Sequence, residues 1–145
     1  MIPVIVLVSA TLAARLVGIA GVDPLDGWQM SLRVGLAAML LLTASAHWGK
    51  RRPDLVAMVP TRLRRAGLLV TVTGVLELVG AVGLLVTPVA PYAAVALALL
   101  FVAMFPANVS AAKRHVAIDG RPVTPLKLRT GMQLLFLAAA VGAAI

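Results

Sequence analysis

Five long apolar runs follow one another along the chain, and the connections between them hold most of the charged residues. Each run has a length of about 17–25 residues, which an α-helix needs to cross a bilayer hydrocarbon core of about 30 Å. The predicted helices cover residues 2–22, 28–47, 66–86, 92–108 and 127–145. The pattern therefore predicts an all-α, polytopic transmembrane helix bundle that forms a single domain over residues 1–145.

Basic residues gather around two of the four connections. Six lie between the second and third runs, and five lie between the fourth run and the start of the fifth: Lys50, Arg51, Arg52, Arg62, Arg64 and Arg65, then Lys113, Arg114, Arg121, Lys127 and Arg129. Because two helices separate these connections, both lie on one side of the membrane, which the positive-inside rule makes cytoplasmic. We therefore expect a bacterial cytoplasmic membrane protein with its N-terminus inside and its C-terminus outside.

The composition narrows the classes of function. The chain is 61% hydrophobic with only 12% charged residues, whereas soluble domains are roughly 45–50% apolar. The net charge of +8 does not indicate nucleic-acid binding, because the basic residues follow the membrane topology. The absence of cysteine excludes disulfides, zinc–thiolate sites and cysteine-bound iron–sulfur clusters within this chain. No metal site, phosphate loop or dinucleotide motif is recognisable, and no catalytic residue can be assigned.

One carboxylate, Glu77, lies near the middle of the third run. An ionisable residue at that depth costs several kcal/mol unless it is paired or protonated. Its helical neighbours three and four residues away are all small: Thr73, Gly74, Gly80 and Ala81. Small residues allow another helix backbone to come close. We therefore expect Glu77 to face other helices, either as a functional group or as a structural polar clamp.

The rise of a helix places the other intramembrane polar residues at two levels. The charged level, in the outer half of the membrane, consists of Glu77, Arg33 and Arg15, and the inner level consists of His47, Asn108 and Gln133. Together these residues predict a polar seam inside the bundle, which is either a ligand site or a structural feature. If the three charges pair, Glu77→Ala leaves both arginines without an acidic partner and destabilises the bundle by a few kcal/mol.

Each member of the seam other than Glu77 also has a simpler interpretation. The two arginines can extend to the outer interface. His47 can form an interfacial pair with Trp48, and Asn108 can cap backbone groups freed by Pro106. Gln133 can act as an interhelical hydrogen-bond donor worth about 1 kcal/mol.

The same residues occur in an order that resembles the DoxX family of small membrane proteins. The resemblance rests on RVGLAAMLLLTASAHW (33–48), Pro60, GVLELVGAVGLL (74–85), FPAN (105–108) and a last helix entered through Gln133. It implies a four-helix core, here the second to fifth helices, plus an extra N-terminal helix. The residue after His47 is Trp, where the family more often has Phe, and residues 2–22 have no counterpart in that core. The family is named for a link to quinone-coupled sulfur oxidation, and some members are partners of redox enzymes.

Three functions remain open at this stage. We favour a non-catalytic accessory or anchor subunit of a membrane redox or envelope complex, because no cofactor motif is evident. The second is a quinone- or lipid-binding protein, or an enzyme acting on such a molecule, with its site in the polar seam. The third is a small transporter. The expected partners are the lipid bilayer and another membrane or membrane-associated protein, with self-association left open and no nucleic acid.

Overall fold

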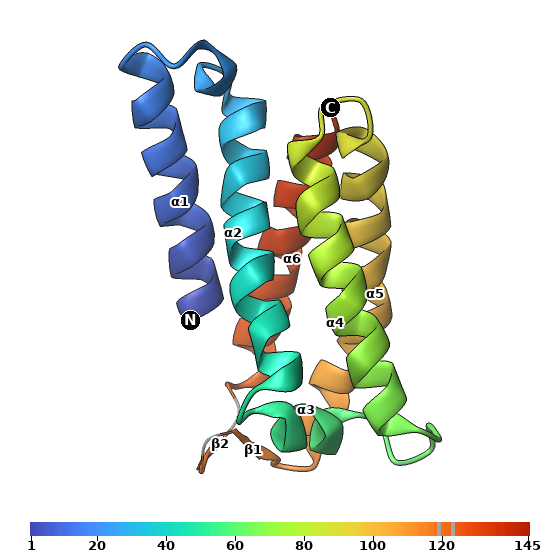
Figure 1. The fold of residues 1–145 in the computed structure, drawn as a ribbon. Coiled ribbons are helices and arrows are strands. Elements are labelled where there is room, and N and C mark those ends of the chain that lie inside the picture. Colours follow the sequence, from blue (N-terminus) through green and yellow to red (C-terminus); the bar gives the residue numbers. More distant parts are fainter. Residues whose placement is uncertain (119, 123) are drawn as a thin grey trace.

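The computed structural model describes residues 1–118, 120–122 and 124–145, so Asp119 and Val123 of the second basic connection lie outside the described residues. Five long helices form a bundle (Figure 1). They are α1 (Ile2–Ile19), α2 (Trp28–Trp48), α4 (Ala66–Leu85), α5 (Ala90–Lys113) and α6 (Leu126–Ala144). All five are long and apolar enough to cross a membrane. The predicted all-α helix bundle is confirmed.

The short elements lie between the long helices. A 3-10 turn, η1 (Asp23–Leu25), joins α1 to α2, and a seven-residue helix, α3 (Arg52–Met58), joins α2 to α4. Two paired two-residue strands, β1 (Ala117–Ile118) and β2 (Arg121–Pro122), precede α6. In Figure 1, α3 and the β1–β2 pair lie at one end of the bundle and η1 lies at the other. The two basic connections therefore share one end, as the sequence predicts.

The ends of two helices differ from the predicted boundaries for local reasons. Helix α1 stops at Ile19 instead of residue 22, and Gly21 follows with φ +109°, a backbone conformation that glycine adopts easily. Helix α5 starts at Ala90, with Pro91 in its first turn, where the missing N–H costs nothing. It also continues through Pro106 to Lys113 instead of ending at Asn108.

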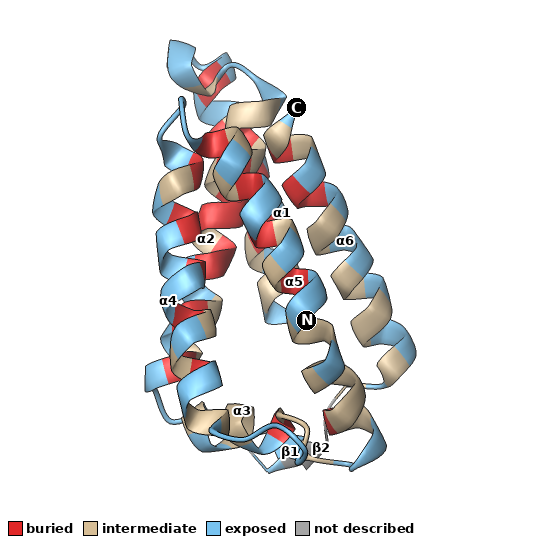
Figure 2. Cartoon of the chain, turned by 90° about the vertical axis from the view of Figure 1, so that its right-hand side faces the viewer, coloured by how far each residue is buried: buried red, intermediate tan, exposed pale blue. Residues whose placement is uncertain are grey.

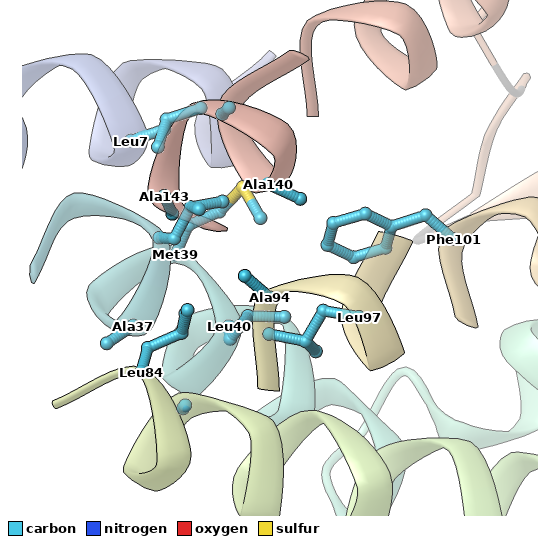
Figure 3. Close-up of a cluster of buried hydrophobic side chains, with 13 residues drawn as sticks. Leu7, Ala37, Met39, Leu40, Leu84, Ala94, Leu97, Phe101, Ala140 and Ala143 are labelled. Carbon is cyan, nitrogen blue, oxygen red and sulfur yellow. The ribbon is translucent and has the colours of Figure 1, made fainter. Parts of the chain in front are cut away.

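The hydrophobic core occupies the half of the bundle remote from α3. Figure 2 shows most of the buried positions in that half. Its larger side chains include Met39 and Leu40 of α2, Leu84 of α4 and Leu97 of α5, which meet in Figure 3. Alanines from four helices fill the space between them: Ala37, Ala81, Ala94, Ala139, Ala140 and Ala143. Such small residues let membrane helices pack closely, where van der Waals contact is a main source of association.

Helix α1 packs along α2 at the edge of the bundle (Figure 1). The contact is made possible by Gly35 of α2, because a Cβ added there would lie 2.7 Å from the carbonyl oxygen of Leu7. Leu7 itself joins the core cluster. The N-terminal helix is thus attached to the second helix, a point that the sequence left undecided.

Candidate functional site

A cavity of about 620 Å³ lies between the core and the α3 end of the bundle. Met39 and Phe101 belong to both the core and the cavity wall. On the other side, Gly49 and Met58 line it from the α2–α3 connection and from α3. Helices α2, α4, α5 and α6 all contribute lining residues, and their arrangement above α3 can be followed in Figure 2.

The first polar group of the cavity consists of Thr43, His47 and Glu77. The Thr43 hydroxyl donates to Oε2 of Glu77 at 2.7 Å, and Nε2 of His47 lies 3.9 Å from Oε1. The Nδ1 atom of His47 is 3.2 Å from the Thr43 carbonyl oxygen, which can only accept. Nδ1 therefore carries the proton in that hydrogen bond, and Nε2 of the neutral ring is an acceptor facing the carboxyl group. Glu77 and His47 are 3% and 5% exposed.

Gly74 allows this group to form. It lies one turn before Glu77 on α4, and a Cβ added there would lie 2.7 Å from both Cβ and Cγ of His47. The α4 backbone thus passes directly against the His47 side chain. The face of α4 that carries Gly74, Glu77, Gly80 and Ala81 is buried, as the small-residue pattern predicts.

The second polar group lies on α5 and α6. An Nη1 hydrogen of Arg129 is donated to Oδ1 of Asn108, and Nε of Arg129 donates to the Thr124 carbonyl oxygen at 3.2 Å. The amide of Gln133 donates to the Phe101 carbonyl oxygen at 2.6 Å. Asn108, Arg129 and Gln133 all line the cavity that Glu77 and His47 line. Four members of the predicted seam therefore share one cavity.

Arg15 and Arg33, the two arginines of the predicted seam, do not line this cavity. The prediction that they form one charged level with Glu77 is wrong. Arg15 forms an ion pair with Asp26 at 2.7 Å and lies over the Trp28 ring, because α1 ends only four residues later and the side chain reaches the connection. Nε of Arg33 donates to the Ala143 carbonyl oxygen at 2.9 Å, where a cation satisfies the C-terminal end of α6. Glu77 instead meets His47 from the inner level.

This pairing differs from the depth estimate for two reasons. In Figure 1, α4 extends further toward α3 than the end of α2 does, so equal residue counts do not give equal heights. In addition, Cα–Cβ bonds tilt toward the N-terminus of a helix, which directs the Glu77 side chain toward the α3 end.

Two members of these polar groups are not among the site residues that the sequence predicts. Thr43 carries no prediction, and Arg129 counts there only as one of the basic residues that indicate the topology. Each stands four residues before a predicted site residue, Thr43 before His47 and Arg129 before Gln133. Because residues four apart share a helix face, this spacing was the signal that could have identified both.

The partners of Glu77 change the expected effect of its removal. Without Glu77, the Thr43 hydroxyl can donate to the Leu40 carbonyl oxygen, 3.1 Å away, and His47 keeps its bond to Thr43. We therefore expect Glu77→Ala to change the free energy of unfolding by less than about 1 kcal/mol, since no donor is stranded. Thr43→Val removes the only donor within hydrogen-bond distance of Glu77 in the described part of the chain, and should cost about 1–3 kcal/mol. Detergent-unfolding curves of both variants test this order, and a larger loss in Glu77→Ala would contradict it.

Comparison with known proteins gives one finding on the family. No curated protein and no solved structure matches the chain. A family model described as "Domain of unknown function (DUF8561)" matches residues 36–144. The matched segment contains every polar residue of the cavity described above and leaves out α1 and the beginning of α2. Since the match covers most of the length of the chain, the chain belongs to the DUF8561 family.

Proposed function

We propose that this chain is a non-catalytic membrane protein that binds a small amphipathic molecule, of the quinone or lipid class, in the cavity between the core and α3. The observation that carries the proposal is the cavity itself, about 620 Å³ in volume and apolar except for a few polar groups. Ligand pockets typically measure about 300–1,000 Å³ and combine apolar walls with a few placed polar groups.

The polar groups suit an oxygen-bearing head group. Nε2 of His47 and the Glu77 carboxyl group can accept a hydrogen bond from a hydroxyl. Arg129 and Asn108 carry N–H groups that can donate to a carbonyl or another acceptor. An amphipathic molecule that places its head group at these atoms keeps its apolar part against Phe101, Met104 and other apolar lining residues.

The cellular setting is part of the same proposal. The basic connections favour a cytoplasmic position for the α3 end, and with it for the cavity, in a bacterial inner membrane. The resemblance to the DoxX family supports an accessory role beside a membrane redox or envelope enzyme, which would use or supply the bound molecule. The ligand-binding function is the better supported of the two, because it alone rests on a structural feature of this chain.

Tryptophan fluorescence provides a test. In a Trp28→Phe background, Trp48 is the only tryptophan, and its ring lies 6.1 Å from the His47 ring beside the cavity. We expect a quinone with a short apolar tail to quench Trp48 saturably in nanodiscs. Ala46 lines the cavity, so Ala46→Phe fills part of it and should weaken this quenching at least about tenfold.

The matched control is Ala138→Phe, which adds the same ring at an exposed position of α6 that is not among the lining residues. In this variant the quinone should quench Trp48 to the same extent as in the parent protein. Quenching that rises linearly with quinone concentration, or that is equal in both variants, would show partition into the lipid and would contradict the proposal.

A further inference from the structure

Basic side chains outnumber acidic ones in the cavity wall. Among the described lining residues Glu77 is the only acid, whereas Lys50 and Arg129 are basic. Arg51 also lines the cavity, but it has an interaction partner of its own. Glu77 is already engaged, because it accepts the Thr43 hydroxyl and faces His47. Lys50 is exposed, whereas Arg129 is partly buried next to the apolar space, so solvent screens the charge of Arg129 less than at the protein surface.

Arg129 is the basic residue most directly available to a ligand. In the described part of the chain its guanidinium donates only to two neutral oxygens, on Asn108 and Thr124, and it forms no ion pair. Its Nη2 group and the side-chain nitrogen of Asn108 have no acceptor among the described residues. A guanidinium in such a place is stabilised by an anion, and its planar fork fits a carboxylate through two parallel hydrogen bonds.

Apolar side chains lie on the same cavity wall. The rings of Phe101 and Phe136 lie 6.1 Å apart between centroids and are tilted by 49°, on the two helices that carry Asn108 and Arg129. Both rings line the cavity, as does Met104. An apolar chain attached to a head group at Arg129 can therefore follow these rings toward the core.

We propose that the cavity binds an amphipathic carboxylate, a molecule with one carboxylate head group and an apolar tail. The carboxylate binds Arg129 and Asn108, and the tail lies along Phe101 and Phe136. This inference rests on the proposed function and specifies the chemical class of the ligand, which differs from a neutral quinone in its charge.

A pair of brominated probes tests the charge preference. Dibrominated stearate and its methyl ester have the same tail and differ in head-group charge, and bromine quenches Trp48 at short range. In the Trp28→Phe protein, in nanodiscs of zwitterionic lipid and mildly alkaline buffer, we expect the acid to bind at least about tenfold more tightly than the ester. Arg129→Gln should reduce this ratio toward one.

Lys127→Gln is the matched control, since it removes the same charge two residues earlier from an exposed position that is not among the lining residues. It should leave the ratio unchanged. Equal affinity for acid and ester in the parent protein, or an acid-to-ester affinity ratio that Arg129→Gln does not change, overturns the preference for an anion. If binding is still saturable in that case, the proposed function stands. No saturable quenching by acid, ester or quinone overturns the proposed function itself.

Discussion

Gly74→Ala is expected to destabilise the bundle and displace His47. The added Cβ would lie 2.7 Å from Cβ and Cγ of His47, and 2.9 Å from the Trp48 ring. These His47 atoms are the base of the side chain and not a flexible end, so α2 and α4 have to move apart. Such overpacking costs about 1–3 kcal/mol, which we expect to exceed the gain of about 1 kcal/mol from the better helix propensity of alanine.

The free energy of unfolding in a detergent titration measures the loss of stability. Saturable quenching of Trp48 by the quinone measures the effect of displacing His47 on ligand binding. Gly67→Ala is the control on the same helix, because the nearest atom to its added Cβ, Nη2 of Arg52, would be 3.9 Å away. It should be neutral or mildly stabilising. If Gly74→Ala behaves like Gly67→Ala, then α4 does not pass as closely to His47 as described.

Arg52→Gln is expected to have the other large effect on stability. Arg52 donates to the carbonyl oxygens of His47 and Gly67 at 2.7 and 3.0 Å, and to the Thr71 hydroxyl at 2.9 Å. The His47 carbonyl lies in the last turn of α2, where carbonyls lack intrahelical partners. One guanidinium thus joins the end of α2 to the start of α4, and its loss should cost about 2–3 kcal/mol.

The matched control is Arg62→Gln, in the same basic connection. Arg62 is exposed and makes no hydrogen bond within the described part of the chain, so its replacement should change stability by less than about 0.5 kcal/mol. Lysine at position 52 should give an intermediate loss, because a single ammonium cannot span three acceptors in the manner of the guanidinium fork. Equal unfolding curves for Arg52→Gln and Arg62→Gln would contradict the bridging role.

The fold could be predicted because each spanning helix has a recognisable pattern in its own stretch of the sequence. Apolar length identifies the five spanning helices, and the small residues around Glu77 correctly indicate the buried face of α4. Basic residues are harder to interpret. Arg52, Arg114 and Arg129 look like topology signals in or beside the basic connections, yet each makes specific hydrogen bonds that join two segments of the chain.

The pairing of polar residues could not be predicted from depth alone. Depth counts assume that neighbouring helices start at one level, whereas Gly74, eight residues into α4, lies against His47 at the end of α2. That offset brings Glu77 to His47 and leaves Arg15 and Arg33 at the other end. The sequence indicates a candidate site in the polar seam but not the size or the walls of the cavity, because these depend on how far apart α1, α2, α4, α5 and α6 lie on the α3 side of the core.

Native mass spectrometry of the full chain, purified from its own membrane in a mild detergent, tests the central claim most directly. We predict one small amphipathic molecule bound per chain in the parent protein and in Ala138→Phe, and its loss from Ala46→Phe, in which the added ring occupies the cavity. A parent protein without a bound molecule, or the same adduct at equal occupancy in all three proteins, would contradict the claim that this cavity is a ligand site.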